Sequence, residues 1–243
     1  MARADDRSRS QACPKQEDAS MRRKSGVSRY TTPKGPEVDF QPGSRNRVLR
    51  NLLDIHRKTD MDRMEYEALV RVQRQYLNRI GQRTRFTAKL LCLMHRDWLA
   101  RIYPWAGQYR TVELEKGGFR WPPAFRIPSN MRVLEKGLLA RCTPCGPGPL
   151  ATVANQIAQV HADLLLIHPF REGNGRLARW VSDLMALQAG LPTPDYGFAG
   201  KGSPARRAEY LAAVRKGYLA DYEPLAAFFV AAFERRLRPS RRP

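Results

Sequence analysis

Residues 168–179 of this 243-residue chain read His-Pro-Phe-Arg-Glu-Gly-Asn-Gly-Arg-Leu-Ala-Arg, and the sequence on either side predicts where this run lies in the fold. Before it, apolar residues recur at steps of three and four, which predicts a buried helix that ends at Pro169. After it, the same spacing predicts a second helix from about Asn174 to Gly190. The apolar positions are Val153, Ile157, Val160, Leu164 and Ile167 before the run, and Leu177, Val181 and Leu184 after it. The run is therefore expected to form a loop between two core helices.

This loop combines groups that can hold and activate a charged ligand. His168 is a titratable base, and Glu172 is a carboxylate that can hold a metal ion. A helix that begins within Gly173-Asn174-Gly175 points free backbone N–H groups and its positive dipole end into the loop, which makes an anion site. Arg176 and Arg179 lie one helical turn apart, so both guanidinium groups face the same opening, where phosphate is the natural ligand.

The run resembles, without a gap, the His-x-Phe-x-(Asp/Glu)-Gly-Asn-Gly-Arg-x-x-Arg signature of the Fic domain family of adenylyltransferases. The segments Trp105–Arg110, Lys116–Phe119 and Trp121–Pro123 also resemble this family, and the similarity spans roughly residues 45 to 237. The resemblance implies an enzyme that moves AMP from ATP to a Ser, Thr or Tyr hydroxyl of a target protein. Pyrophosphate is released, and Mg²⁺ is the implied cofactor.

The resemblance also implies a role for each residue of the motif. His168 would be the general base that takes the proton of the attacking hydroxyl. Glu172 would hold Mg²⁺ between the α- and β-phosphates of ATP, and Phe170 would belong to the core. The implied nucleotide-binding residues are Gly173, Asn174 and Gly175 as an anion hole, Arg176 on the β-phosphate side and Arg179 on the γ-phosphate.

A short β-hairpin is predicted at about residues 109–123. Residues 111–115 alternate apolar and polar side chains, Lys116-Gly117-Gly118 interrupts the alternation, and Phe119-Arg120-Trp121 resumes it before two prolines. In the Fic family a hairpin of this kind, the flap, lies over the site and pairs with the target segment. On this resemblance Lys116, Gly117 and Phe119 are expected to dock the target, and a plain surface hairpin is the alternative.

The rest of the chain predicts further helices and no strand that alternates with them. Asp62 and Glu65 are interpreted as a capping-box-like start of the first of these helices. The predicted helices cover about residues 61–80 and 90–102 and two segments that open at Ser203-Pro204 and Glu223-Pro224. The predicted fold class is therefore all-α, a Fic-type helical bundle with one short β-hairpin, over residues 42–243.

Residues 1–41 differ from the rest in composition, with many basic residues, Ser and Pro and almost no apolar run. Such a segment cannot repay the entropy of ordering, which predicts a disordered basic tail. It contains no apolar region typical of a secretory signal, and no run of 18 apolar residues occurs elsewhere. We therefore expect a cytoplasmic protein without a membrane segment.

The net charge of +20 favours a different class of function, a basic nucleic-acid-binding module. However, the basic residues extend from Arg3 to Arg242 and are not gathered in one recognition helix, so no specific nucleic acid is expected. A scaffold that only binds ligands is a further alternative. So is a phosphotransferase like the Doc relatives of the family, although these typically depart from Gly175 and lack the second arginine.

Regulation is predicted from a missing pattern. Many Fic proteins carry an inhibitory helix with the pattern (Ser/Thr)-x-x-x-Glu-(Gly/Asn), whose glutamate pairs with the second motif arginine. The nearest string in this sequence, Thr111 to Lys116, lacks the final Gly or Asn. We therefore expect a small antitoxin, the partner of a toxin-antitoxin pair, to supply a glutamate to Arg179 in trans. Constitutive activity is the alternative.

Overall fold

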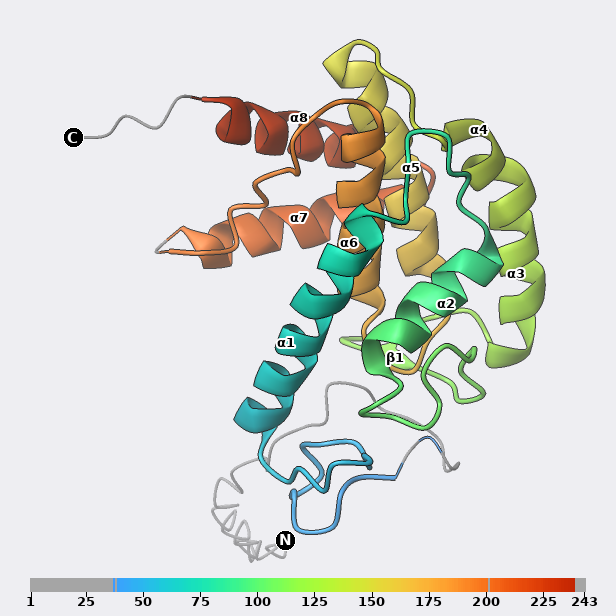
Figure 1. The fold of residues 1–243 in the computed structure, drawn as a ribbon, viewed down its shortest axis with the longest axis vertical. Coiled ribbons are helices and arrows are strands. Elements are labelled where there is room, and N and C mark those ends of the chain that lie inside the picture. Colours follow the sequence, from blue (N-terminus) through green and yellow to red (C-terminus); the bar gives the residue numbers. More distant parts are fainter. Residues whose placement is uncertain (1–36, 38, 201, 239–243) are drawn as a thin grey trace, which may run out of the picture.

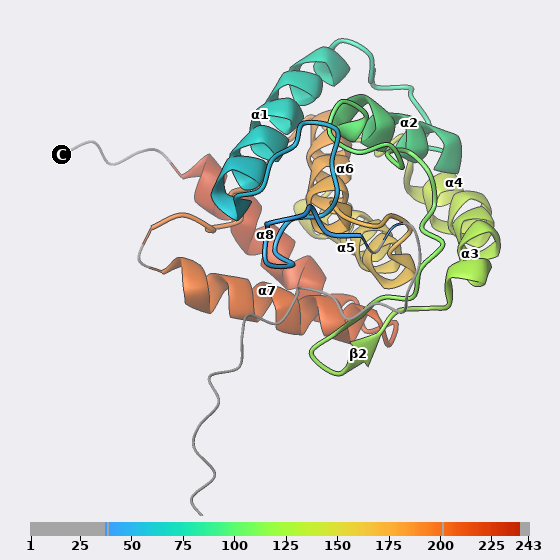
Figure 2. The ribbon, with the colours of Figure 1, turned by 90° about the horizontal axis from the view of Figure 1, so that it is seen from below.

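A computed structural model describes residue 37, residues 39–200 and residues 202–238 of the chain. Figure 1 shows a bundle built around α5 (Leu150–Ile167) and α6 (Asn174–Gln188), which are the helices predicted on either side of the motif loop. In the view of Figure 2 these two helices lie at the centre, and other helices surround them. The surrounding helices are α1 (Lys58–Leu77), α2 (Ala88–Leu99), α3 (Ile127–Leu134), α7 (Ser203–Gly217) and α8 (Glu223–Leu237). The predicted all-α bundle with one hairpin is confirmed.

The central helix α5 is buried because its neighbours cover it on most sides. It packs against α8, α6, α7 and α3, and its residues Ala154, Ile157 and Ala158 have no exposed surface. Within the described part of the chain, α5 is the one helix long and apolar enough to cross a membrane by length and composition. The core of a helical bundle demands the same apolar character, and the burial of α5 accounts for it.

The first long helix begins earlier than the sequence predicted. α1 starts at Lys58, and its N-cap residue, Arg57, makes no side-chain cap. The predicted capping box of Asp62 and Glu65 is therefore wrong. Glu65 lies inside the helix and is 2% exposed, because its carboxylate is paired within the core and not with the helix end.

A helical segment before α5 was not predicted. It consists of a 3-10 turn η2 (Ala124–Arg126), α3, a π-helical turn η3 (Glu135–Leu139) and the short α4 (Ala140–Cys142). Pro128 and Gly137 interrupt the sequence pattern here. Pro128 lies in the first turn of α3, where its missing N–H costs no hydrogen bond, and Gly137 lies in the π-helical turn.

The predicted hairpin exists but is shorter than expected. Its strands are β1 (Glu115–Lys116) and β2 (Phe119–Arg120), and Lys116 pairs with Phe119. Gly117 and Gly118 form the two-residue turn, with φ values of +56° and +77° that suit the tightest hairpin connection. Val112, Leu114 and Trp121 lie outside these two-residue strands and pack together as a small apolar cluster. Figure 2 shows the hairpin beside the end of α7.

The predicted tail of residues 1–41 lies almost entirely outside the described residues. Near its end, Phe40 forms an isolated β-bridge with Leu49, and the Gln41 N–H donates to the Val48 carbonyl at 2.9 Å. Gln41 is 8% exposed. Packing therefore begins a few residues before the predicted domain boundary.

Candidate active site

The motif loop between α5 and α6 is closed by its own hydrogen bonds. The side-chain amide of Asn174 accepts from the Phe170 N–H at 2.9 Å and donates to the Phe170 carbonyl at 2.7 Å. The Phe170 ring is fully buried, as predicted for a core residue. Asn174 therefore uses its side chain to hold the loop, while its backbone N–H lies at the start of α6.

The two glycines of the loop differ in what they are needed for. Gly173 has a φ of +84°, and a Cβ there would lie 2.8 Å from the Trp98 ring, so the protein's own packing requires glycine. At Gly175 a Cβ would meet only the Arg179 side chain, at 3.7 Å. Gly175 lies in the first turn of α6, where backbone N–H groups have no partner within the helix. The packing of the protein itself therefore does not require glycine at this second position.

His168 terminates α5 in a conformation unusual for a non-glycine residue. Its φ of 51° and ψ of 59° are left-handed, and its N–H donates to the Leu164 carbonyl. The Nδ1 atom lies 3.1 Å from the Leu165 carbonyl, so Nδ1 carries the proton in this contact and Nε2 carries the lone pair. Burial lowers the pKa of His168 to about 3, and the nearby positive charge of Arg110 adds to this effect. The imidazole is therefore neutral at pH 7, as a general base must be.

His95, which lies in α2, contacts the loop and was not identified from the sequence. Its ring stacks on Phe170 at 3.9 Å. Its Nδ1 accepts from the Gly107 N–H at 2.8 Å, so Nε2 is the donor to the Glu172 carbonyl at 3.1 Å. Burial lowers the pKa of His95 to about 4, which keeps this pattern intact at neutral pH. A histidine on an apolar helix gives no local sign of partners 12 and 77 residues away.

Arg176 is held by an ion pair that the sequence did not predict. Its Nη2 lies 2.6 Å from the Glu65 carboxylate and 3.6 Å from that of Glu172, and its guanidinium lies over the Trp98 ring. The other carboxylate oxygen of Glu65 accepts from the Tyr103 hydroxyl at 2.6 Å. Burial opposes the charged form of Arg176, but the carboxylates of Glu65 and Glu172 outweigh it and raise the Arg176 pKa.

Arg179 has a different environment from Arg176, although both come from α6. It is partly exposed and lies 5.7 Å from the Phe198 ring centroid. Burial raises the pKa of Tyr210, and the nearby positive charge of Arg179 opposes this rise. Arg179 forms no ion pair with the residues that the structure describes. Asp183 lies one turn further along α6, and its burial raises its pKa to about 7 against the opposing effects of Tyr196 and Arg179.

Glu172 lies at the edge of the loop, where its carboxylate is 3.6 Å from the Arg176 Nη2 atom. Its side chain is 14% exposed, and one oxygen accepts from the Gly173 N–H at 3.1 Å. Among the described residues there is no group of three or more His, Cys, Asp or Glu side chains that could hold a metal ion together. Mg²⁺ often binds through one carboxylate together with substrate phosphates and water. Glu172 fits that mode of binding, in which the nucleotide completes the metal site.

The flap is tied to the motif loop through a buried arginine. Arg110 is 2% exposed. It donates to the His168 carbonyl at 2.8 Å and to the carbonyls of Val112 and Pro122 at 2.7 Å each. It thus holds both legs of the hairpin against the residue that ends α5. The sequence flagged the segment around Arg110 by resemblance but assigned it no role.

The predicted target-docking residues of the flap do not share one environment. Lys116 and Gly117 are exposed at the tip. Phe119 is half-buried, and its ring lies 5.0 Å from that of Tyr218 and 5.3 Å from that of Trp121. Phe119 therefore anchors the hairpin to the end of α7, whereas the tip is exposed.

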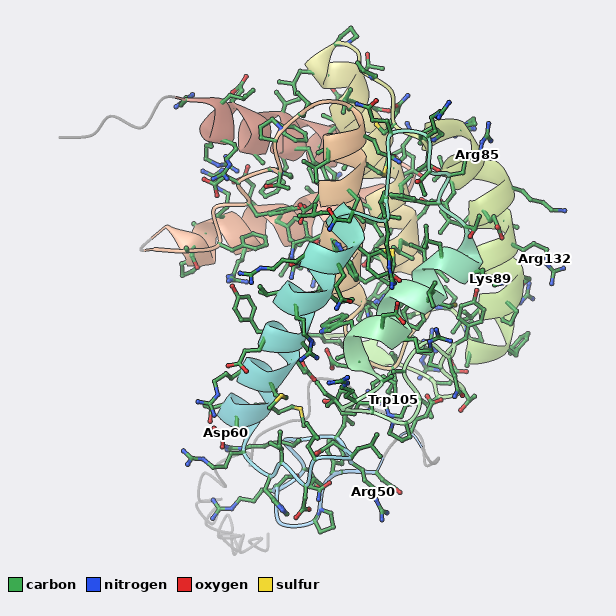
Figure 3. All side chains as sticks on the ribbon, viewed as in Figure 1. Arg50, Asp60, Arg85, Lys89, Trp105 and Arg132 are labelled. Carbon is green, nitrogen blue, oxygen red and sulfur yellow. The ribbon has the colours of Figure 1, made fainter. Side chains whose placement is uncertain are left out.

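The positive charge of the surface is not concentrated at the motif. Figure 3 shows Arg85, Lys89 and Arg132 on the side formed by α2 and α3, and Arg50 in the segment before α1. All four are exposed. Among the described residues, these exposed basic side chains are therefore spread over several elements of the fold.

The chain is similar to known Fic proteins in both sequence and fold. A family model described as the Fic/DOC family matches residues 85–186. The probable protein adenylyltransferase Fic of Salmonella typhimurium is 27% identical over 190 residues, which cover 76% of this chain and 87% of that protein. The probable protein adenylyltransferase y4lH of Sinorhizobium fredii is 30% identical over 136 residues, covering 55% of this chain and 66% of that protein. The crystal structure of the BepC protein of Bartonella tribocorum, with bound AMPPNP, has a TM-score of 0.61 at 21% identity. The match covers 76% of this chain and 91% of that one, and it shows a shared fold.

Proposed function

Because the chain belongs to the Fic/DOC family, we propose that it is a protein adenylyltransferase that transfers AMP from ATP to a hydroxyl of a target protein. The observation that carries this proposal is the buried, neutral His168 beside the N-terminus of α6. A base and an anion site meet there within one short loop. This is the pair of functions that transfer of a nucleotide to a hydroxyl requires.

In the proposed reaction the hydroxyl oxygen of a Ser, Thr or Tyr attacks the α-phosphorus of ATP. Nε2 of His168 takes the hydroxyl proton, the bond between the α-phosphorus and the bridging oxygen breaks, and pyrophosphate leaves. The low pKa of His168 belongs to the protein without nucleotide. Bound triphosphate raises it, because a nearby negative charge favours the imidazolium.

The proposed nucleotide site uses the backbone N–H groups of Asn174 and Gly175 and both motif arginines. The pairing with Glu65 holds the Arg176 guanidinium in one place for the β-phosphate side, and Arg179 receives the γ-phosphate. Two guanidinium groups then orient the triphosphate, so that the α-phosphorus faces the base. Glu172 would hold Mg²⁺, which when bound neutralises charge on the phosphates.

Transfer of radioactive label tests this proposal directly. The purified chain is incubated with Mg²⁺, a lysate as the source of target proteins, and ATP labelled at either the α- or the γ-phosphate. We expect protein to acquire the α label, and His168→Ala to lose about 10²- to 10⁴-fold in rate, the usual contribution of a general base. His56→Ala, the same change at an exposed histidine, is the matched control. Transfer of γ label that requires the added chain and is lost in His168→Ala would instead identify a Doc-like phosphotransferase, and persistent α label in His168→Ala would remove the assignment of the base.

We also propose that a small partner protein inhibits the enzyme in the cytoplasm by supplying a glutamate to Arg179. The partly exposed position of Arg179, without an ion pair to the described residues, supports this proposal. Co-expression with the product of a short neighbouring reading frame should suppress labelling. An Arg179→Lys variant should respond less to that product, because an ammonium group cannot form the paired hydrogen bonds of a guanidinium. Equal suppression of both proteins would contradict a glutamate contact at Arg179.

A further inference from the structure

Trp121, which follows the second strand of the flap, covers the ring of His168. The two ring centroids lie 4.1 Å apart at an interplanar angle of 35°. Both residues are nearly inaccessible to water, at 8% and 5% exposure. The indole therefore provides part of the apolar surroundings that keep the imidazole dry.

The two rings also share a hydrogen-bond acceptor. The Trp121 Nε1–H donates to the Leu165 carbonyl at 3.0 Å, and the Nδ1 atom of His168 lies 3.1 Å from the same oxygen. A carbonyl oxygen has two lone pairs and can accept from both rings, but it cannot donate. The contact with His168 is therefore favourable only while Nδ1 carries the proton. The indole fixes the neighbouring position on this acceptor and limits rotation of the imidazole.

The same residue connects the base to the flap. The backbone N–H of Trp121 donates to the Leu114 carbonyl at 3.1 Å, and the indole packs with Val112 and Leu114. Phe119 of β2 meets the indole edge-on at 5.3 Å. The orientation of the indole thus depends on how the hairpin is seated.

We propose that Trp121 is a positioning residue for AMP transfer, which keeps the His168 ring in a single orientation and in the Nδ1–H tautomer. In this state Nε2 is the nitrogen that takes the hydroxyl proton. The proposal rests on the function proposed above for His168. It assigns a catalytic purpose to a flap residue that does not belong to the motif.

The first test compares pH profiles of kcat/KM between pH 5.5 and 8.5 for the wild type, Trp121→Phe and Trp121→Ala. For the wild type we expect kcat/KM to stay constant as the pH falls from neutral to 5.5. In Trp121→Ala the ring is exposed to water, so activity should fall at all pH values and fall further below the ordinary histidine pKa. At pH 5.5 it should be about tenfold lower than at pH 7.5 for a pKa near 6.5. Trp121→Phe keeps an aromatic cover but loses the bond to Leu165, and should lie between the two.

Leu139→Ala is the matched control, since Leu139 is fully buried in the main core and lies outside the cluster of Val112, Leu114 and Trp121. It should lower the melting temperature and leave the acid side of the profile flat. If Trp121→Ala and Trp121→Phe lose activity equally at every pH, so that their profiles are as flat on the acid side as that of Leu139→Ala, then Trp121 is only a packing residue and the proposal fails. Trp121→Phe preserves this test if the alanine variant does not fold.

A second measurement does not depend on activity. The ¹⁵N chemical shifts of the His168 imidazole report which ring nitrogen carries the proton. We expect the Nδ1–H tautomer in the wild type and a mixture in Trp121→Phe. An unchanged tautomer in this variant would overturn the proposal. If the wild type transfers no AMP but the tautomer changes as expected, the proposed function fails while the role of Trp121 in orienting the ring stands.

Discussion

The motif loop and the flap are neighbours that are built in opposite ways. The loop is fixed from several parts of the fold: Asn174 closes it, His95 supports it from α2, and Arg110 holds its first residue. The flap is anchored at its base by Arg110 and by aromatic contacts, but it has strands of only two residues each and an exposed glycine turn. The difference suggests a division of labour, in which the loop keeps the geometry of the chemistry and the flap adapts to a partner.

This comparison predicts large effects on stability beside the loop and small ones at the flap. The largest is expected for Glu65→Ala, which leaves the Arg176 guanidinium partly buried without its closest carboxylate. Breaking a buried ion pair from one side costs about 3–5 kcal/mol. Urea denaturation would measure this cost. Glu67→Ala, at an exposed position of the same helix, should change stability by less than about 0.5 kcal/mol. Equal stability of the two variants would show that the ion pair does not hold the site.

Lowering the pH should also reduce the free energy of unfolding, because three histidines are buried in their neutral form. Burial lowers the folded-state pKa of His95 to about 4 and those of His161 and His168 to about 3, whereas an unfolded histidine titrates near 6.5. Below pH 6.5 the unfolded chain therefore binds more protons than the folded one. The stabilisation that these histidines provide by being buried in their neutral form is fully present above pH 6.5. It is lost progressively as the pH falls toward their folded-state pKa values. Each histidine contributes a slope of up to about 1.4 kcal/mol per pH unit, or about 4 kcal/mol for three.

Denaturation curves at pH 7.5, 6.0 and 5.0 would measure this slope. His161→Gln removes one of the three buried imidazoles, which contacts Ser182 and Tyr210 and lies outside the motif. Its slope should be shallower than that of the wild type by up to about 1.4 kcal/mol per pH unit. An identical slope in the two proteins would mean that other groups dominate the acid response.

The sequence predicted the parts of the site that depend on neighbours along the chain. The two helices, the glycine loop and the positions of His168 and the arginines on it all follow from spacing within about 20 residues. The short hairpin with its Gly117-Gly118 turn is equally local. Each of these elements is encoded in a continuous pattern.

The supporting residues could not be predicted in the same way, because their partners are distant in sequence. Arg110 contacts the carbonyl of a residue 58 positions away, and Glu65 pairs with Tyr103 at a separation of 38. A buried glutamate near a helix start fits a local capping pattern equally well, so Glu65 was assigned to the wrong role. Only the packing of α1 against α2 and α6 distinguishes the two possibilities.

The two motif arginines, both on α6, should differ in how much they contribute to stability and to ATP binding. Arg179→Ala should weaken ATP binding by about 1.5–3 kcal/mol, the range for hydrogen bonds to charged groups, and reduce AMP transfer further through lost alignment. Its melting temperature should change little, because Arg179 is partly exposed and has no ion pair to the described residues. Arg176→Ala should lower both the affinity for ATP and the stability of the fold, since the substitution leaves the buried Glu65 carboxylate without its ion-pair partner. Calorimetric titration and thermal melting separate the two outcomes. Unchanged ATP affinity and labelling in Arg179→Ala would show that the γ-phosphate is held elsewhere.

The smallest effect on stability is expected at the flap tip, and it tests whether the flap acts separately from the loop. Lys116 is exposed beside the turn, so Lys116→Ala should change the free energy of unfolding by less than about 0.5 kcal/mol and should leave ATP affinity unchanged. If the tip docks the target, KM for the target should rise by up to about fivefold, since most interface side chains contribute less than about 1 kcal/mol. Arg120→Ala on the second strand, where the guanidinium pairs with Glu115 at the surface, provides a control for loss of positive charge. A melting temperature lowered as far as in Glu65→Ala, or a loss of ATP affinity, would show that the flap and the loop form one unit.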